Sequence, residues 1–550
     1  MEPKINLLTR RSFLDRSLKT GIGVALSTLV DVPFIMKRAL AEGNIGLNGK
    51  KVLFIWLRGA NDAINSVIPI QDSAYNITNR PSLMIPKDAG TNYATTGPAD
   101  VPQAGSGSTY GSYPFGIRLG NGFAALHPSL KFLAPVYNGD GVTGGDLALI
   151  HRVAYPKQSR SHFDSQRYWE NGNPNNNLSN DGIFYRTIYE SGLANTSPLT
   201  GITIQSSLPL ILRGSAAAMT NLTDPTRYDL LGIPNETNGN YKASAYLNAA
   251  NGVPLTTKNY REMLELQYQN MSKTLSLFAN INFNDDGNTF QDDEITDNDT
   301  EWAAANGNKG YYLFPATNVK NGGWRRPDGT NAANKYVVQP AYQSFFNNLK
   351  AAALVLNKTS AIIAGTELGG FDTHQSQGQF TGNHPYLNQV IGWSIYALRK
   401  YFKQHADQAT WNNTVIVTLS EFGRTTIENS DQGTDHAEAT AMLVAGGSVK
   451  GFGKQGSVTG VYNCGGNGDP AATPWIGGQA GSMFGVSGRY LQRNTDYRSV
   501  LGEIIRDHLG ATQNQLNRII PGYANSNEKL LSGGASGIDG VSVRGEVGIL

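Results

Sequence analysis

Residues 360–374 read Ser-Ala-Ile-Ile-Ala-Gly-Thr-Glu-Leu-Gly-Gly-Phe-Asp-Thr-His, an apolar run followed by paired glycines, Asp372 and His374. The run is too short for a core helix, and its Ile and Ala content is typical of a buried strand. Gly369 and Gly370 allow a sharp turn at the end of this strand. In α/β sheets such ends present ligand-binding and catalytic groups. The stretch therefore predicts a strand that carries an Asp and a His to a functional edge.

The two side chains that follow this turn are suited to a metal. Asp372 supplies a carboxylate oxygen and His374 an imidazole nitrogen, a pair that fits Zn, Mn or Fe. In the alternative interpretation, the Asp caps the next helix and the His forms a local hydrogen bond. The metal interpretation gains weight because three similar turns occur elsewhere in the chain. They carry Asp62, Glu421, and Asp435 with His436.

Strand and helix patterns alternate along the chain. Buried strands are predicted at 51–57, 147–153, 414–419 and 441–445, and helices from 161 onward and at 342–356, 385–403 and 496–509. This alternation predicts an α/β fold with a mostly parallel central sheet, helices on both faces and loop insertions. Loops after parallel strands meet at one edge of a sheet, so the four turns could form a site for one or two divalent metals.

Composition excludes several classes of protein. The chain has 550 residues, enough for one large α/β domain with insertions or for several smaller domains. Charged residues make up 16%, which is too few for a disordered or nucleic-acid-coating protein. The net charge of +2 changes to −2 when residues 1–41 are set aside, so no nucleic acid or anionic membrane is expected as a partner. The single cysteine, Cys464, excludes an internal disulfide and a cysteine-based zinc site.

The N-terminus predicts export. Arg10 and Arg11 precede a short apolar run at 21–30 and a small-x-small sequence, Ala39-Leu40-Ala41. This arrangement is typical of a twin-arginine signal peptide over residues 1–41. The run is too short to span a membrane, and no other segment is long and apolar enough. We therefore expect the twin-arginine translocase as a partner, a periplasmic or secreted protein without a transmembrane anchor, and one domain over residues 42–550.

Residues 159–166, Ser-Arg-Ser-His-Phe-Asp-Ser-Gln, carry a second candidate site. Ser161 and Asp164 form a capping box at the start of a helix, which is a sufficient structural explanation. A hydroxyl at a helix N-terminus is also where an anion meets free N–H groups and the positive end of the dipole. Arg160 and His162, beside this hydroxyl, favour a catalytic role, and the two interpretations stay open.

A long insert at about 282–340 contains acidic residues and a possible calcium loop. Residues 282–293 follow the spacing of such a loop, but Asn282 stands first and Asp293 stands where a bidentate Glu is expected. A solvated acidic loop is the alternative. His127, directly before Pro128, is interpreted as a helix-entry residue and not as a ligand.

Five motifs in order resemble those of the DUF1501 family. They are Leu57-Arg-Gly-Ala-Asn-Asp-Ala-Ile-Asn65, Ser159-Arg-Ser-His-Phe-Asp-Ser-Gln166, Glu367-Leu-Gly-Gly-Phe-Asp-Thr-His374, Ser420-Glu-Phe-Gly-Arg424 and Gly433-Thr-Asp-His436. The resemblance implies a bacterial protein exported by the twin-arginine pathway, with an alkaline-phosphatase-like fold distantly related to sulfatases. It also implies transfer or hydrolysis of phosphoryl or sulfuryl groups.

Carried over by position, the resemblance assigns roles to individual residues. It makes Asp62 a metal ligand after the first strand, and Ser161 the nucleophile. Arg160 would contact the oxygens of the substrate. Asp372, His374 and His436 would hold a divalent metal, Zn, Mn, Ca or Mg. The chain departs from the pattern at Ser420-Glu421, where the superfamily usually has an Asp-His pair, and it lacks a Cys-x-Pro-x-Arg motif.

Three functions remain open from the sequence. The first is an exported metal-dependent hydrolase that acts on phosphate or sulfate esters of an anionic small molecule or glycan. The second is a non-catalytic protein on the same fold that binds a glycan or an envelope partner. The third is another exported metalloenzyme, such as an oxidoreductase.

Overall fold

The computed structural model describes residues 45–46, 48–87, 115–139, 144–193, 200–215, 219–223, 281, 289–290, 311–314, 340–454, 459–465 and 489–550. The predicted signal peptide at 1–41, most of the predicted acidic insert and most of the possible calcium loop lie outside these residues. The helices described there do not combine the length and the apolar character that crossing a membrane requires.

A large central sheet forms the middle layer of the molecule. Its strands are β1 (Lys51–Leu57), β5 (Leu147–Ala154), β6 (Gly201–Ile204), β7 (Thr220–Leu222), β10 (Ile363–Leu368), β11 (Thr414–Leu419), β12 (Thr440–Ala445), β13 (Val461–Tyr462) and β14 (Thr495–Asp496). They lie in the order β13-β5-β12-β11-β1-β10-β6-β7, with β14 beside β5. The pairs on either side of β12 are antiparallel, and the other pairs are parallel. The predicted mostly parallel sheet is confirmed.

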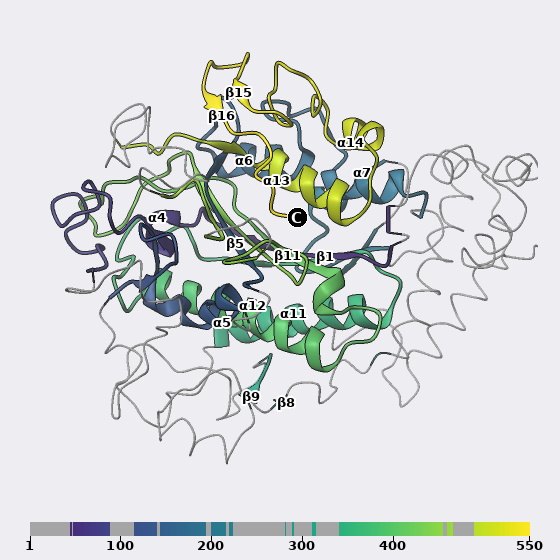
Figure 1. Cartoon of the computed structure of the whole chain (residues 1–550), viewed down its shortest axis with the longest axis horizontal. Coiled ribbons are helices and arrows are strands. Elements are labelled where there is room, and N and C mark those ends of the chain that lie inside the picture. The colour runs from purple at the N-terminus through teal and green to yellow at the C-terminus, as the bar shows by residue number, and fades with distance from the viewer. Residues whose placement is uncertain are drawn as a thin grey trace, which may run out of the picture.

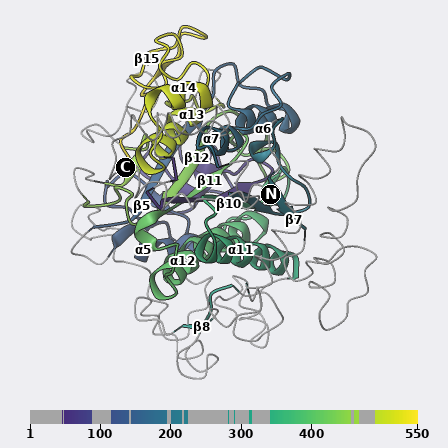
Figure 2. The same cartoon turned by 90° about the vertical axis from the view of Figure 1, so that its right-hand side faces the viewer.

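Helices cover both faces of this sheet (Figure 1, Figure 2). One face carries α5 (Ala134–Asn138), α11 (Pro340–Lys358) and α12 (Asn383–Gln404). The opposite face carries α6 (His162–Asn171), α7 (Ile183–Glu190), α13 (Tyr497–Glu503) and α14 (Gln513–Ile519).

The side chains of β1 show why both faces need covering. Its side chains alternate along the strand, so Leu53, Ile55 and Leu57 pack into the core beneath α11 and α12. Val52, Phe54 and Trp56 pack into the core beneath α6, α7 and α13. All seven residues of β1 are buried, which explains why the strand is a continuous apolar run in the sequence.

The remaining described elements are short. They are α4 (Ala63–Ser66), β2 (Val67–Ile68), β3 (Ile117–Arg118), β4 (Ala125–Leu126), η2 (Pro128–Leu133), η3 (Leu210–Leu212), β8 (Thr289–Phe290), β9 (Tyr311–Tyr312), η5 (Trp411–Asn413), the π-helical turn η6 (Ile504–His508), β15 (Gly534–Ala535) and β16 (Ser542–Val543). His127 is buried at the entry to η2, where its Nδ1 accepts the backbone N–H of Ser129 at 3.0 Å. Its predicted helix-entry role is confirmed.

Two details correct the sequence interpretation. Beyond the last predicted helix, at 496–509, the structure contains α14, which begins at a capping box formed by Thr512 and Gln515. In addition, β12 runs antiparallel to β11. Asp435 and His436 therefore precede the start of β12, which lies at the same edge of the sheet as the carboxyl ends of β10 and β11. This reversal still places them beside Asp372.

Candidate metal centre

The turn after β10 presents Asp372 and His374 at the carboxyl edge of the sheet. Gly370 has a φ of 107°, a conformation that favours glycine, and the chain turns there as predicted. The loop after β1 lies directly against this turn. A Cβ at Gly59 would lie 2.4 Å from the backbone nitrogen of Asp372, so only glycine allows the two loops to approach this closely.

Ligand atoms from three parts of the chain approach one another at this edge. His436 Nε2 lies 3.0 Å from His162 Nε2 and 2.9 Å from His374 Nε2. Asp372 Oδ1 lies 3.5, 3.1 and 3.2 Å from the Nε2 atoms of His162, His374 and His436, respectively. We call these four residues the histidine cluster. A tetrahedral metal with ligands at about 2.0–2.1 Å separates its ligand atoms by about 3.3 Å. The spacing among His162, Asp372 and His436 fits one ion, and His374 adjoins these three residues.

The opposite nitrogen of each ring faces an oxygen acceptor. His162 Nδ1 lies 2.8 Å from Glu421 Oε1, His374 Nδ1 lies 3.4 Å from Asp435 Oδ1, and His436 Nδ1 lies 2.9 Å from the carbonyl oxygen of Arg160. An oxygen acceptor requires an N–H at Nδ1, so a neutral ring carries its lone pair on Nε2. The three rings are thus held in the tautomer that a metal requires.

This arrangement concentrates lone pairs at one point. Three Nε2 atoms and the Asp372 carboxylate face one another, and a cation between them removes the repulsion. Burial opposes ionisation of Asp372, but the hydrogen bond and charge of Arg424 outweigh it and hold the pKa of Asp372 at about 2. Burial first, and then Arg424, lower the pKa of His436, which favours its neutral form.

The hydrogen bond that His162 donates to Glu421 raises the pKa of His162, although burial opposes the rise. A more basic imidazole is a stronger metal ligand. Glu421 itself is nearly fully buried, and its Oε1 also accepts the backbone N–H of Gly59 at 2.8 Å. Glu421 therefore fixes His162 from behind and also ties the loop after β1 to the cluster.

The histidine cluster is open to solvent. The side chain of Asp372 is 47% exposed, and those of His162 and His436 are 28% and 25% exposed. Structural zinc sites are closed, whereas catalytic metal sites leave room for water or substrate. The exposure of the histidine cluster fits the catalytic kind.

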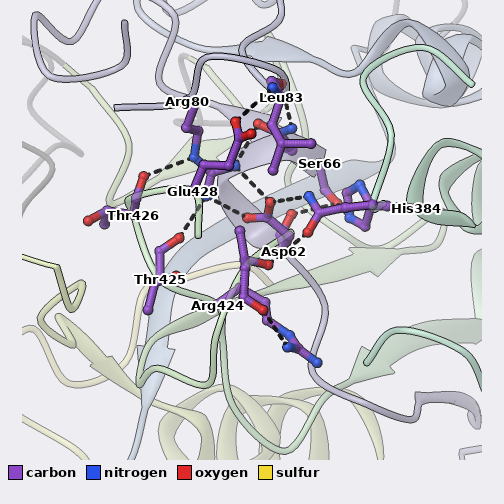
Figure 3. A network of polar contacts seen from close by, with 12 residues as sticks. Asp62, Ser66, Arg80, Leu83, His384, Arg424, Thr425, Thr426 and Glu428 are labelled. Carbon is purple, nitrogen blue, oxygen red and sulfur yellow. Dashed lines mark hydrogen bonds and ion pairs between the residues drawn. The ribbon is translucent and has the colours of Figure 1, made fainter. Parts of the chain in front are cut away.

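Asp62, predicted as a ligand, lies apart from the cluster in a buried network (Figure 3). Its carboxylate lies 2.7 Å from Arg80 Nη1 and accepts a hydrogen bond from Gln377 Nε2 at 2.7 Å. Burial raises the pKa of Asp62, but the charge of Arg80 outweighs it and keeps the pKa below its usual range. These donors already satisfy the carboxylate, so Asp62 is an ion-pair partner in this arrangement.

Glu421 and Asp435, also predicted as ligands, lie behind the histidines. Each faces an Nδ1 atom, on the side of the ring opposite the convergence point. Asp435 further accepts from Arg489 at 2.6 Å and from Asn429 at 3.0 Å. The structure therefore gives both residues a positioning role, whereas His162, predicted as catalytic, supplies one of the four converging atoms.

Ser161 and Arg160 flank His162. Ser161 is the N-cap of α6, and its Oγ accepts the backbone N–H of Asp164 at 3.4 Å. Arg160 pairs with Glu438 at 3.0 Å and lies over the ring of Tyr490 at 3.7 Å. The predicted cap is thus observed, while the guanidinium of Arg160 contacts protein groups.

Sequence reasoning missed two arginines that organise this edge. Arg424 lies within one of the quoted motifs and donates to Asp372 and to the carbonyl oxygens of Gly59 and Ala60. Arg80 had no recognisable motif, because its partner Asp62 is 18 residues away and its other acceptors, the carbonyls of Thr425 and Thr426, lie about 345 residues away.

Comparisons with known proteins give one match. No curated protein and no solved structure matches the chain. The model of the family described as "Protein of unknown function (DUF1501)" matches residues 238–461. This range includes Asp372, His374, Glu421 and His436 but not Asp62 or Ser161. This match supports the resemblance to the DUF1501 family that the sequence motifs indicated.

Proposed function

We propose that the protein hydrolyses phosphate or sulfate esters and depends on a divalent metal held by the histidine cluster. The observation that carries this proposal is the group formed by His162, Asp372 and His436, whose ligand atoms lie 3.0, 3.2 and 3.5 Å apart in pairs. The donor set suits Zn, Mn or Fe better than Ca or Mg, which prefer all-oxygen sites. Such an ion would supply a Lewis acid beside the bound ester.

The start of α6 is the second support for ester hydrolysis. His162 is the first residue of this ten-residue helix, so the free N–H groups and the positive end of its dipole lie beside the cluster. An anionic ester bound there would place its phosphorus or sulfur near Ser161. The Ser161 oxygen would form the new bond while the alcohol leaves, and water would then release the phosphate or sulfate. To contact the ester oxygens, Arg160 would have to break its ion pair with Glu438. This pair is solvent-exposed and contributes little stability, so breaking it costs little.

The decisive experiment compares Ser161 variants in an assay with p-nitrophenyl phosphate and p-nitrophenyl sulfate after loading with Zn or Mn. Ser161→Ala is expected to abolish turnover and, through loss of the cap, to lower stability by about 1 kcal/mol. Thr512→Ala is the matched control, because Thr512 caps α14 in the same way on a distant helix. It should lose similar stability and keep full turnover.

Ser161→Asp separates capping from catalysis. Asp can accept the N–H of residue 164 but cannot replace the hydroxyl as a nucleophile. Full turnover in this variant would remove Ser161 from the mechanism. If the metal-loaded wild type hydrolyses neither ester, the non-catalytic alternative is favoured, and bound Fe or Mn with redox activity would favour an oxidoreductase.

We also propose export by the twin-arginine pathway, which rests on Arg10, Arg11 and the residues up to Ala41. Replacing both arginines by lysine should leave full-length protein in the cytoplasm, because the pathway recognises the guanidinium pair. Cell fractionation and N-terminal sequencing measure this. Normal processing near Ala41 in the double variant contradicts the proposal.

A further inference from the structure

Two adjoining clefts lie along the sheet edge next to the histidine cluster. The α6 cleft has a volume of about 730 Å³ and is lined by α6 and the loops after β1 and β6. The α11 cleft has a volume of about 440 Å³ and is lined by α11, the start of α12 and the turn after β10. Gln205 and Glu367 line both clefts, so the two clefts adjoin. Both volumes lie in the usual range for ligand sites, about 300–1,000 Å³.

Residues that neighbour the histidine cluster in sequence line both clefts. Phe163 and Asp164, which line the α6 cleft, directly follow His162. Gly369 and Gly370, which line the α11 cleft, precede Asp372 by three and two residues, respectively.

The charges of the α6 cleft balance. Its lining contains three arginines and three carboxylates: Arg58, Arg167, Arg213, Asp164, Glu170 and Glu367. Arg58 is held by Glu367 at 2.8 Å and by Glu170 at 3.3 Å, so its charge is already neutralised. The α11 cleft is lined mainly by uncharged polar groups such as Ser344, Asn348 and Asn383. Neither cleft has the net positive charge that a polyanion requires.

The lining offers an aromatic ring and hydrogen-bonding groups of both kinds. Phe163 is 89% exposed, which is rare for a large apolar side chain and leaves its ring free to stack. Gln205 is 3% exposed, and within the described residues its Oε1 has no hydrogen-bond partner; Arg58 Nη1 likewise has none. One group is an acceptor and the other a donor. A hydroxyl can serve both, because it donates one hydrogen bond and accepts two.

We propose that the two clefts together bind a neutral oligosaccharide, with Phe163 stacking on one sugar ring. Sugar hydroxyls match the mixture of amide, carboxylate and guanidinium groups that line the clefts. Oligosaccharide binding is argued independently of the proposed function. The further step, in which the bound sugar carries the ester that is hydrolysed at the histidine cluster, rests on the proposed function.

Calorimetric titration of EDTA-treated full-length protein tests the binding. The probes are neutral gluco- and xylo-oligosaccharides of two to six sugars, with oligogalacturonates of equal length as acidic counterparts. Neutral hexasaccharides should bind more tightly than disaccharides and more tightly than the acidic chains. Phe163→Ala should weaken binding about tenfold through loss of stacking and buried area. Ile77→Ala, which also truncates an exposed apolar side chain (65%), is the matched control and should change nothing.

A second variant fills the α11 cleft. A Cβ at Gly369 would meet no atom within 4 Å, so Gly369→Leu can place its side chain in the cleft. It should weaken hexasaccharide binding and leave disaccharide binding unchanged. The proposal is overturned if no neutral oligosaccharide binds, if only acidic chains bind, or if Phe163→Ala binds as wild type does. Because the titration uses metal-free protein, the two proposals can fail separately. Sugar binding without ester turnover refutes only the proposed ester hydrolysis. Ester turnover without sugar binding refutes only the proposed oligosaccharide site.

Discussion

Asp62 and Asp372 follow neighbouring parallel strands, β1 and β10, yet their surroundings differ completely. Asp62 is fully buried and faces protein donors, Arg80 and Gln377, each at 2.7 Å. Asp372 is 47% exposed and faces Arg424 on one side and three imidazole Nε2 atoms on the other. In sequence both are strand-end carboxylates, and His374 is the neighbour that distinguishes Asp372 from Asp62.

The difference shows which surroundings suit such a carboxylate to bind a metal. Around Asp62 the neighbours donate protons, so its charge is balanced within the chain. Around Asp372 the neighbouring imidazoles present lone pairs, because Glu421, Asp435 and the Arg160 carbonyl hold their N–H groups on the far side. A strand-end carboxylate thus becomes a ligand when its neighbours also offer lone pairs.

Removing the arginine of the buried pair should have the largest effect on stability. Arg80→Met leaves Asp62 buried without a counter-ion, which is expected to lower the free energy of unfolding by about 3–5 kcal/mol. Metal bound per folded chain should not change. Urea denaturation and metal analysis of the folded fraction measure both quantities. The double variant Arg80→Met, Asp62→Asn should recover part of the lost free energy of unfolding. A variant that loses metal but keeps its stability would contradict the proposed difference between Asp62 and Asp372.

The same variant should reverse a pH dependence. In the wild type the pair lowers the pKa of Asp62, so its stabilisation is full above the unfolded value of about 3.9 and is lost as the pH falls through the folded value. In Arg80→Met the arginine no longer offsets burial, which raises the folded pKa of Asp62, and only the weaker influences of His384 and Gln377 still lower it. The cost of burying the ionised Asp62 carboxylate then falls as the pH falls, because the carboxylate becomes protonated. The stability gap between wild type and variant should be smaller near pH 5 than near pH 7.5.

A smaller effect is expected behind the cluster. Glu421→Gln keeps an acceptor for His162 Nδ1 but removes the charge, and should weaken metal affinity ten- to hundredfold, as second-layer changes typically do. Asp435→Asn is the matched variant: its contact with His374 is longer, 3.4 Å against 2.8 Å, so its effect should be smaller. Competition with a fluorescent chelator measures both constants. Equal effects, or none, would contradict the positioning role.

Much of the fold could be predicted because the sheet is buried on both faces. Strands such as β1 and β11 are continuous apolar runs, and the predicted bounds 51–57 and 414–419 match the structure. The direction of β12 could not be predicted, because a buried strand has the same pattern in either direction. The capping box of α14 was present in the sequence at Thr512 and Gln515 but was not recognised.

For the site, the sequence predicted the edge of the sheet but not the role of each residue. Asp372, His374 and His436 do converge, since strand-end loops share that edge. Which acidic groups are ligands depends on their partners, and these partners are distant in sequence: Arg80 for Asp62, and Gly59 and His162 for Glu421. His162 was assigned to catalysis because it adjoins Ser161, and nothing local indicated that its ring faces His436.

The most direct test of the central claim, that the histidine cluster and not Asp62 binds metal, is metal stoichiometry. Wild type, His436→Ala, Asp372→Ala and Asp62→Asn are dialysed against Zn or Mn and analysed by mass spectrometry, with circular dichroism to verify folding. Wild type and Asp62→Asn should bind about one ion per chain, as one tetrahedral site requires, and the two cluster variants should bind none. Metal retained in both cluster variants, or lost from folded Asp62→Asn, would contradict the claim.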